Sequence, residues 1–120
     1  MNQFQVFDSD NVSEDKFELW YLRNKIGHRI GLVFLSFLDN NVHLGWSRCC
    51  KLDRFDRVRA QNIAYQRAKV GWGPNIRVPR DIERLMKHIV RKLHSRKAAY
   101  RVWVNGEEKV GSFTKKIGRL

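Results

Sequence analysis

Residues 16–24 alternate apolar and polar positions in the way that is typical of a half-buried strand. Phe17, Leu19 and Tyr21 fall on one face, because successive side chains of a strand point to opposite sides. The short segment 25–28 follows as a turn, so we expect the next apolar run to pair with this strand as a hairpin.

Residues 30–38 form the most apolar run of the chain, with Ser36 as its polar member. A strand that is apolar on both faces needs cover on both, so we expect it to lie at the centre of a sheet. Residues 39–41 (Asp-Asn-Asn) supply a turn that tolerates left-handed backbone, and residues 42–49 follow as a third strand. These segments predict a three-stranded antiparallel meander.

Two helices are expected in the second half of the chain. Asp53, with an acid three residues later at Asp56, resembles a capping box, so the first helix is expected from about residue 54 to residue 70, with Gly71 as its stop. Pro79 fits the first position of a second helix, whose apolar residues recur at helical spacing on a single stripe. That stripe consists of Ile82, Leu85, Met86, Ile89 and Leu93.

The Asn105-Gly106 pair is the strongest short hairpin signal in the chain, because both central residues of this turn adopt positive φ. Residues 100–104 and 107–113 flank the pair as two strands. The elements together predict an α+β fold, in which two helices pack on an antiparallel sheet of about five strands. The sheet would combine the three-stranded N-terminal meander with the C-terminal hairpin.

Length and composition agree with one small domain. A chain of 120 residues makes a single domain, 1–120, and 42% hydrophobic and 12% aromatic residues suffice to fill a core. The acidic N-terminal segment 1–15 and the basic tail 114–120 flank the predicted elements, and we expect both to be flexible. The acidic segment is either a solvated tail or a regulatory arm that folds over the basic face, and the sequence leaves this open.

The chain carries 24 Lys and Arg against 12 Asp and Glu, which gives a formal net charge of +12. Most of this excess lies in the predicted helical region, where residues 54–101 hold fourteen cations and three acids. Such a field favours a polyanionic partner. Residues 30–38 are too few for a membrane helix of ~20 residues, and the chain begins with no signal-peptide pattern, so we expect a cytoplasmic protein without a membrane partner.

The cationic face of the second helix is the leading candidate for binding. At 100° per residue its cations fall within ~60° of one another and opposite the apolar stripe, which makes a basic ridge that can follow a phosphate backbone. The ridge consists of Arg80, Arg84, Lys87 and Arg91, with His94 continuing the row. Arg54 and Arg57, at the start of the first helix, are further candidate contacts. The alternative is that these charges only solvate the outer face of an amphipathic helix.

Aromatic side chains that lie among cations are candidates for stacking on exposed bases. Trp72 lies between Gly71 and Gly73 in the loop between the helices, so the pattern gives it no place in the core and makes it the main stacking candidate. Trp103 shares a hairpin face with Arg101 and is either exposed or part of the cover of the sheet.

The junction between the third strand and the first helix is another candidate site, because free N–H groups at a helix start can hold a phosphate. Ser47, Arg48 and Lys51 lie there as candidate anion ligands, which would make the domain a nucleotide-binding module. Asp53 and Asp56 occupy the same end, and capping of the helix by these carboxylates is the alternative.

The sequence contains no pattern that indicates catalysis. It has no Gly-rich phosphate loop, no two His residues flanking a Glu on one helical face, and no nucleophile elbow. Cys49 and Cys50 are adjacent, and a bridge between neighbours is strained, so we expect free thiols rather than a disulfide or a zinc site. The sequence therefore predicts a non-enzymatic protein without cofactor or metal.

Three segments carry a resemblance to known proteins: residues 45–49 (Gly-Trp-Ser-Arg-Cys), 53–56 (Asp-Arg-Phe-Asp) and 63–67 (Ile-Ala-Tyr-Gln-Arg). In this pattern the chain resembles a group of small, poorly characterised bacteriophage proteins. The resemblance implies a phage product that acts in the bacterial cytoplasm, and it brings no activity whose residues could be carried over. Such proteins commonly bind nucleic acid, or bind and inhibit a host enzyme or defence complex.

The first expectation is a non-enzymatic protein that binds DNA or RNA mainly through phosphates, with weak sequence specificity. The alternative is a phage inhibitor that docks its cationic face on a host defence or nucleic-acid-processing protein, in the manner of anti-CRISPR or anti-restriction proteins. Charge steers protein partners as readily as nucleic acid, so it does not separate the two. The sequence also leaves open whether the domain forms a homodimer.

Overall fold

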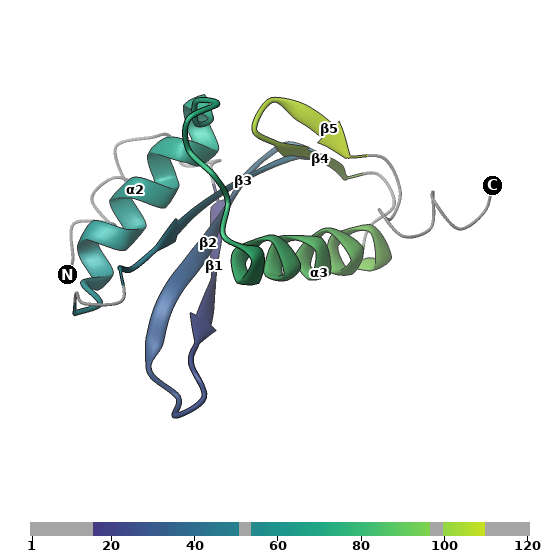
Figure 1. Ribbon diagram of the computed structural model, residues 1–120. Helices are drawn as coiled ribbons and strands as arrows, with labels where there is room; N and C mark the ends of the chain where they lie inside the picture. The colour runs from purple at the N-terminus through teal and green to yellow at the C-terminus, as the bar shows by residue number, and fades with distance from the viewer. Residues whose placement is uncertain (1–15, 51–53, 97–99, 110–120) are drawn as a thin grey trace.

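The structure is a computed structural model, and it describes residues 16–50, 54–96 and 100–109 (Figure 1). The elements in chain order are strands β1 (Lys16–Arg23), β2 (Arg29–Leu38) and β3 (Asn41–Arg48), helices α2 (Arg57–Val70) and α3 (Arg80–Arg96), and strands β4 (Arg101–Val104) and β5 (Glu107–Lys109). Several predictions fall outside the described residues: the flexible segments 1–15 and 114–120, Lys51, Asp53, and residues 110–113 of the last predicted strand.

The five strands form one sheet in the order β1-β2-β3-β4-β5, and with the two helices they confirm the predicted α+β fold. β1, β2 and β3 make the expected antiparallel meander, and each lies within one residue of its predicted bounds. β4 and β5 are antiparallel around Asn105 and Gly106, whose φ values of 51° and 83° are those of the predicted tight turn.

The sheet is not antiparallel throughout, because β4 pairs with β3 in parallel. The register runs from Asn41 opposite Arg101 to Leu44 opposite Val104. Both helices lie in the connection between these two strands, and a connection of that length lets β4 enter the sheet from the same end as β3. Within the described residues, segment 45–48 of β3 therefore has no strand partner on the side away from β2.

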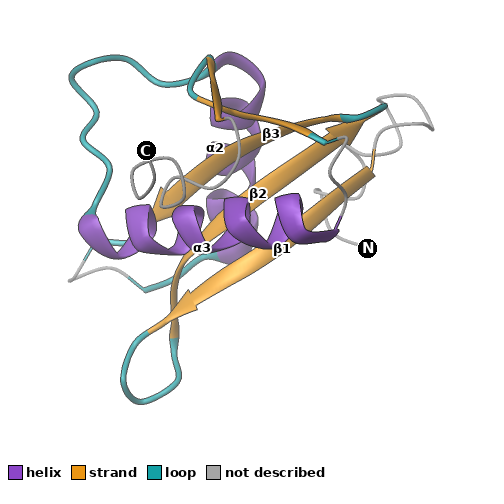
Figure 2. Cartoon of the chain, turned by 90° about the vertical axis from the view of Figure 1, so that its right-hand side faces the viewer, coloured by secondary structure: helices purple, strands orange, loops and turns teal. Residues whose placement is uncertain are grey.

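Both faces of the sheet are covered, as the doubly apolar β2 predicts. Val33 and Leu35 belong to a buried cluster with the apolar stripe of α3, whereas Leu32 and Phe34 belong to a second cluster with the alanines of α2. Figure 2 shows α3 in front of the sheet and α2 behind it. The domain therefore has three layers, and each large apolar side chain buried between them contributes roughly 1.5–3 kcal/mol.

Helix α2 begins at Arg57, three residues later than predicted. Its cap is Asp56 rather than Asp53, and the Asp56 carboxylate accepts a hydrogen bond from the backbone N–H of Arg59 at 3.1 Å. Residues 54–56 lead into the helix, and Phe55 among them packs edge-on against Tyr21 of β1, with ring centroids 6.3 Å apart. The backbone of Asp56 is extended (φ −111°, ψ 108°), so the helix does not continue back to residue 54.

Small residues let α2 lie directly on β3. Ala60, Ala64 and Ala68 are the buried apolar residues of the helix, and Gly45 has no side chain to hold the helix away from the strand. The hydroxyl of Ser47 donates a hydrogen bond to the carbonyl of Ala60 at 3.0 Å, which ties the strand to the first turns of the helix.

The chain passes from α2 to α3 around the β3 side of the sheet through loop 71–79 (Figures 1 and 2). Gly71 ends α2 as predicted, with a φ of 81° and an amide that donates to the carbonyl of Arg67 at 2.8 Å. The backbone N–H of Trp72 then donates to Oδ1 of Asn105 at 2.8 Å. The loop is thereby fastened to the turn between β4 and β5.

We predict that Gly45→Ala destabilises the domain by at least about 2–3 kcal/mol, because the added methyl group would overlap the backbone of α2 at Ala64 and Ala68. The measurement is the free energy of unfolding in urea. Gly73→Ala is the matched control, since open space surrounds that position and its cost should stay within about 0.5 kcal/mol. Equal stability of Gly45→Ala and the wild type would contradict the close contact of α2 with β3.

Candidate nucleic-acid interface

Helix α3 turns its cations away from the sheet. Its apolar stripe is buried in the core, with Leu85 half-buried at the side, and the opposite surface of the helix therefore faces solvent. Arg80, Arg84, Lys87 and Arg91 are all exposed on that surface. A rise of 1.5 Å per residue makes the row from the first to the last of them about 16 Å long.

Little negative charge lies along this row. Within the described residues, Arg80, Arg84 and Arg91 form no ion pair. Glu83 is the exposed acid of α3, whereas His88 and Lys92 add further basic side chains to its solvent face. The helix therefore presents a cationic surface that its own residues do not neutralise. Neither α2 nor α3 is long and apolar enough to cross a membrane.

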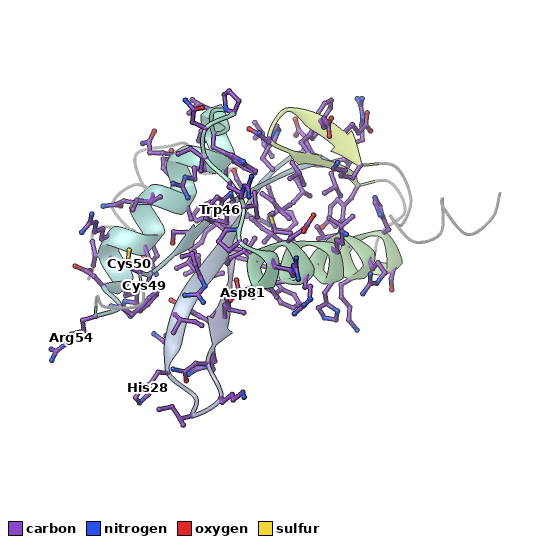
Figure 3. All side chains as sticks on the ribbon, in the orientation of Figure 1. His28, Trp46, Cys49, Cys50, Arg54 and Asp81 are labelled. Atoms are coloured by element: carbon purple, nitrogen blue, oxygen red, sulfur yellow. The ribbon has the colours of Figure 1, made fainter. Side chains whose placement is uncertain are left out.

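Asp81 is directed away from the ridge, toward the end of β3 (Figure 3). Arg48 binds its carboxylate through Nη2 at 2.9 Å and through Nε at 3.1 Å, and both side chains are about one-third exposed. The carboxylate also lies in the first turn of α3, where the helix dipole favours negative charge. The ion pair thus fixes the start of α3 to the sheet.

His94 lies at the edge of the row nearest the apolar stripe, and it is less accessible than the four cations. The residue is half-buried, and its Nδ1 is buried without a hydrogen-bond partner. Helical geometry gives the reason, because position 94 follows the buried Val90 by four residues and falls on the flank of the apolar stripe. The basic ridge therefore consists of Arg80, Arg84, Lys87 and Arg91.

Arg54 and Arg57 are exposed, but they lie at the start of α2, across the sheet from α3 (Figures 1 and 3). The sequence grouped them with the ridge because both helices are basic. The three-layer arrangement separates them, since α2 and α3 cover opposite faces of the sheet. The candidate contacts therefore form two surfaces rather than one.

Trp72 is half-buried rather than free in its loop, contrary to the sequence prediction. Its ring packs edge-on against the buried Trp46, with centroids 5.9 Å apart. The flanking glycines allow the loop to fold close to β3, so the ring fills space beside the core. Less of the Trp72 ring is open to a base than the sequence implies.

Arg67, the last residue of the segment 63–67, has a structural role that the sequence did not predict. Its guanidinium lies 4.2 Å from the centre of the Trp46 ring, and its Nη1 donates to the carbonyl of Trp46 at 3.0 Å. Partial burial lowers the pKa of Arg67 below its ordinary value. Trp46 belongs to the segment of β3 that β4 does not reach. By bonding its carbonyl, Arg67 occupies a backbone group on the unpaired side of β3 that could otherwise pair with another strand.

Trp103 lies on the face of the sheet that α2 covers, because its neighbour Val102 points to the α3 side. It stacks on His43 with ring centroids 6.0 Å apart, Arg101 lies 5.3 Å from its ring centre, and its Nε1 donates to Oδ1 of Asn41 at 3.1 Å. His43 is the direct partner of Trp103 in the parallel register of β3 and β4. The sequence could not place the two rings together, because nothing local predicts that pairing.

Two of the three ligands proposed for an anion site between the third strand and the first helix are engaged within the fold, and the third, Lys51, lies outside the described residues. Ser47 is buried and bonded to Ala60, and Arg48 is bonded to Asp81 and to the carbonyl of Cys49. The alternative, capping of the helix start by a carboxylate, is what Asp56 does. The described residues include no group of three or more His, Cys, Asp or Glu side chains placed to hold a metal ion.

Comparison with known proteins adds no relative: no protein-family model, no curated protein and no solved structure matches the chain.

We predict that His43 makes the domain less stable in mild acid. Burial, and then the charge of Lys69, lowers the pKa of His43 below its ordinary value of 6.5. The unfolded chain then takes up the proton more readily than the folded one, so this contribution is complete above pH 6.5 and is lost as the pH falls through 6.5 toward the folded pKa.

Chemical denaturation between about pH 7.5 and about pH 5.5, on either side of the histidine pKa, measures this effect. His43→Phe is the informative variant, because it keeps a ring against Trp103 and does not titrate. Its stability should fall less over this range than that of the wild type. An equal fall in both proteins would contradict the role of His43.

Proposed function

We propose that the domain binds nucleic acid, DNA or RNA, in the cytoplasm through the basic ridge, and that it catalyses no reaction. The observation that supports this most is the exposure of Arg80, Arg84, Lys87 and Arg91 in one row on the solvent face of α3. Closely spaced cations repel one another, and a polyanion relieves that repulsion.

The spacing of the ridge suits phosphates. Successive ridge residues are three or four positions apart on the helix, which places their Cβ atoms about 5–6 Å from one another. Lys and Arg side chains at such intervals can contact neighbouring phosphates of one strand, and each contact releases condensed counterions. Phosphate contacts carry no sequence information, so we expect weak sequence specificity.

The competing proposal is a phage inhibitor whose cationic face docks on an acidic host protein. It rests on the resemblance to bacteriophage proteins and on the same charge, which steers protein partners equally well. A pull-down from lysate treated with nuclease separates the two proposals. Loss of every captured protein after the treatment would favour direct binding of nucleic acid, whereas retention of one stoichiometric partner would favour the inhibitor.

The direct test removes three ridge cations in Arg84→Ala/Lys87→Ala/Arg91→Ala. Fluorescence anisotropy over a range of salt concentrations gives the slope of log K against log salt, with a duplex that carries 5′-hydroxyl ends as ligand. Each lost phosphate contact should reduce the magnitude of the slope by about one, so we expect a reduction of about two to three.

The matched control removes three exposed cations that lie off α3 and were never candidate contacts, in Lys16→Ala/Lys25→Ala/Lys69→Ala. Both variants lose the same formal charge, so a difference between them reports position rather than net charge. The control should keep most of the wild-type slope. An unchanged slope in the ridge variant, or equal losses in both variants, would overturn the ridge as the contact surface.

A further inference from the structure

A hollow lies where the β1–β2 hairpin, the end of β3 and the start of α2 meet. It consists of two adjoining spaces of about 350 and 770 Å³, and both are lined by Arg48, Cys49, Cys50, Arg54 and Phe55. Figure 3 shows the two cysteines beside the start of α2, with the Arg54 side chain extending outward from the same region and His28 at the tip of the hairpin. The basic ridge takes no part in this hollow.

The lining of the hollow carries an excess of positive charge. Arg23, Arg29 and Arg54 line the larger space, and Arg59 lines the smaller one together with Arg54. Among the described lining residues Asp56 is the one acid, and its carboxylate already caps α2. Because Arg48 is paired with Asp81, the charge that remains comes from these four guanidinium groups.

Two of these arginines are held in place by the fold. The guanidinium of Arg29 lies 4.1 Å from the centre of the Tyr21 ring, and Tyr21 is itself fixed by Phe55 and by the Nε2 group of Gln61. Nη1 of Arg23 donates to the carbonyl of Gly27 at 2.8 Å. Since a guanidinium has five N–H donors, each retains donors for a ligand while losing little further freedom on binding.

The chemistry of the walls defines the ligand class. Planar guanidinium groups match the geometry of phosphate oxygens and are the preferred protein donors for them. Phe55, Ile30 and Ile63 give the hollow an apolar side, which suits the sugar or base attached to a phosphate. Even the smaller space, at about 350 Å³, is large enough for a small ligand.

We propose that this hollow binds a terminal phosphate group of a nucleotide or nucleic-acid strand, a phosphomonoester held by Arg29, Arg54 and Arg59. The anion is held by side chains, because the Asp56 carboxylate already caps the start of α2 through the backbone N–H of Arg59. The sequence placed an anion site at this junction on Ser47, Arg48 and Lys51. The site proposed here uses other residues and does not rest on the basic ridge.

Cys50 provides a local reporter for occupancy of the hollow. Its thiol is free and exposed, and the residue lines both spaces. The rate of its alkylation by iodoacetamide, assigned by mass spectrometry, should fall when a ligand fills the hollow. At a ligand concentration about ten times the Kd, occupancy leaves the thiol free about one-tenth of the time, so we expect a rate about tenfold slower.

The probes form two matched pairs, a single-stranded oligonucleotide with a 5′-phosphate or a 5′-hydroxyl end, and adenosine 5′-monophosphate or adenosine. Protection by the phosphorylated member of a pair, without protection by its partner, supports the proposal. Equal protection by both phosphorylated probes identifies free nucleotides as sufficient ligands, whereas protection by the phosphorylated oligonucleotide alone identifies strand ends. Absence of any difference within both pairs would overturn the proposal.

Arg54→Gln/Arg59→Gln tests the site itself and should abolish the protection, with rates compared with and without ligand within each protein. Both side chains are exposed, so the variant is expected to fold, and circular dichroism checks this. Lys16→Gln/Lys69→Gln is the matched control and should keep the protection, because these two exposed cations belong neither to the hollow nor to the ridge. Protection that persists in the Arg54→Gln/Arg59→Gln variant would place the phosphate elsewhere and overturn the assignment.

Salt-dependent binding of hydroxyl-ended duplex tests the ridge separately, so failure of the ridge proposal is distinguishable from failure of the hollow proposal.

Discussion

Both faces of β2 are buried, with Val33 and Leu35 under α3 and Leu32 and Phe34 under α2. A strand of this composition stays folded only if a layer covers each side, and the two helices supply those layers. The chain must therefore pass from one face of the sheet to the other between α2 and α3, which it does through loop 71–79 around the β3 side. The same requirement sends the outward cations of the two helices to opposite sides of the domain.

The sequence predicted the elements whose signal is local. The meander follows from alternation and turn residues, α3 from one apolar stripe, and the last hairpin from Asn105-Gly106. The parallel pairing of β3 with β4 has no such signal, because it joins residues about sixty positions apart. The start of α2 was misplaced since two aspartates offered caps, and the choice between them depends on tertiary contacts such as Phe55 against Tyr21.

The candidate functional residues also fall into those that local sequence predicts and those that depend on the fold. The exposed ridge follows from helical geometry alone, and so its four cations were predictable, whereas His94 required knowledge of which flank the core covers. Trp72 and Arg48 were proposed as ligand-binding residues, but the fold uses them against Trp46 and Asp81. The arginine-lined hollow was not predictable in its final composition, because its cations come from a hairpin, a lead-in segment and a helix that only the fold brings together.

The central claim is that the solvent face of α3 contacts nucleic acid, and an NMR titration tests it most directly. Backbone amide and arginine Nε–Hε resonances of the isotope-labelled domain would be followed while a short duplex with 5′-hydroxyl ends is added. Binding through the ridge predicts that the largest shifts occur along Arg80–Arg96, including the side chains of Arg84 and Arg91, and that these shifts diminish with added salt. Shifts confined to α2 or to β4 and β5, with α3 unchanged, would contradict it.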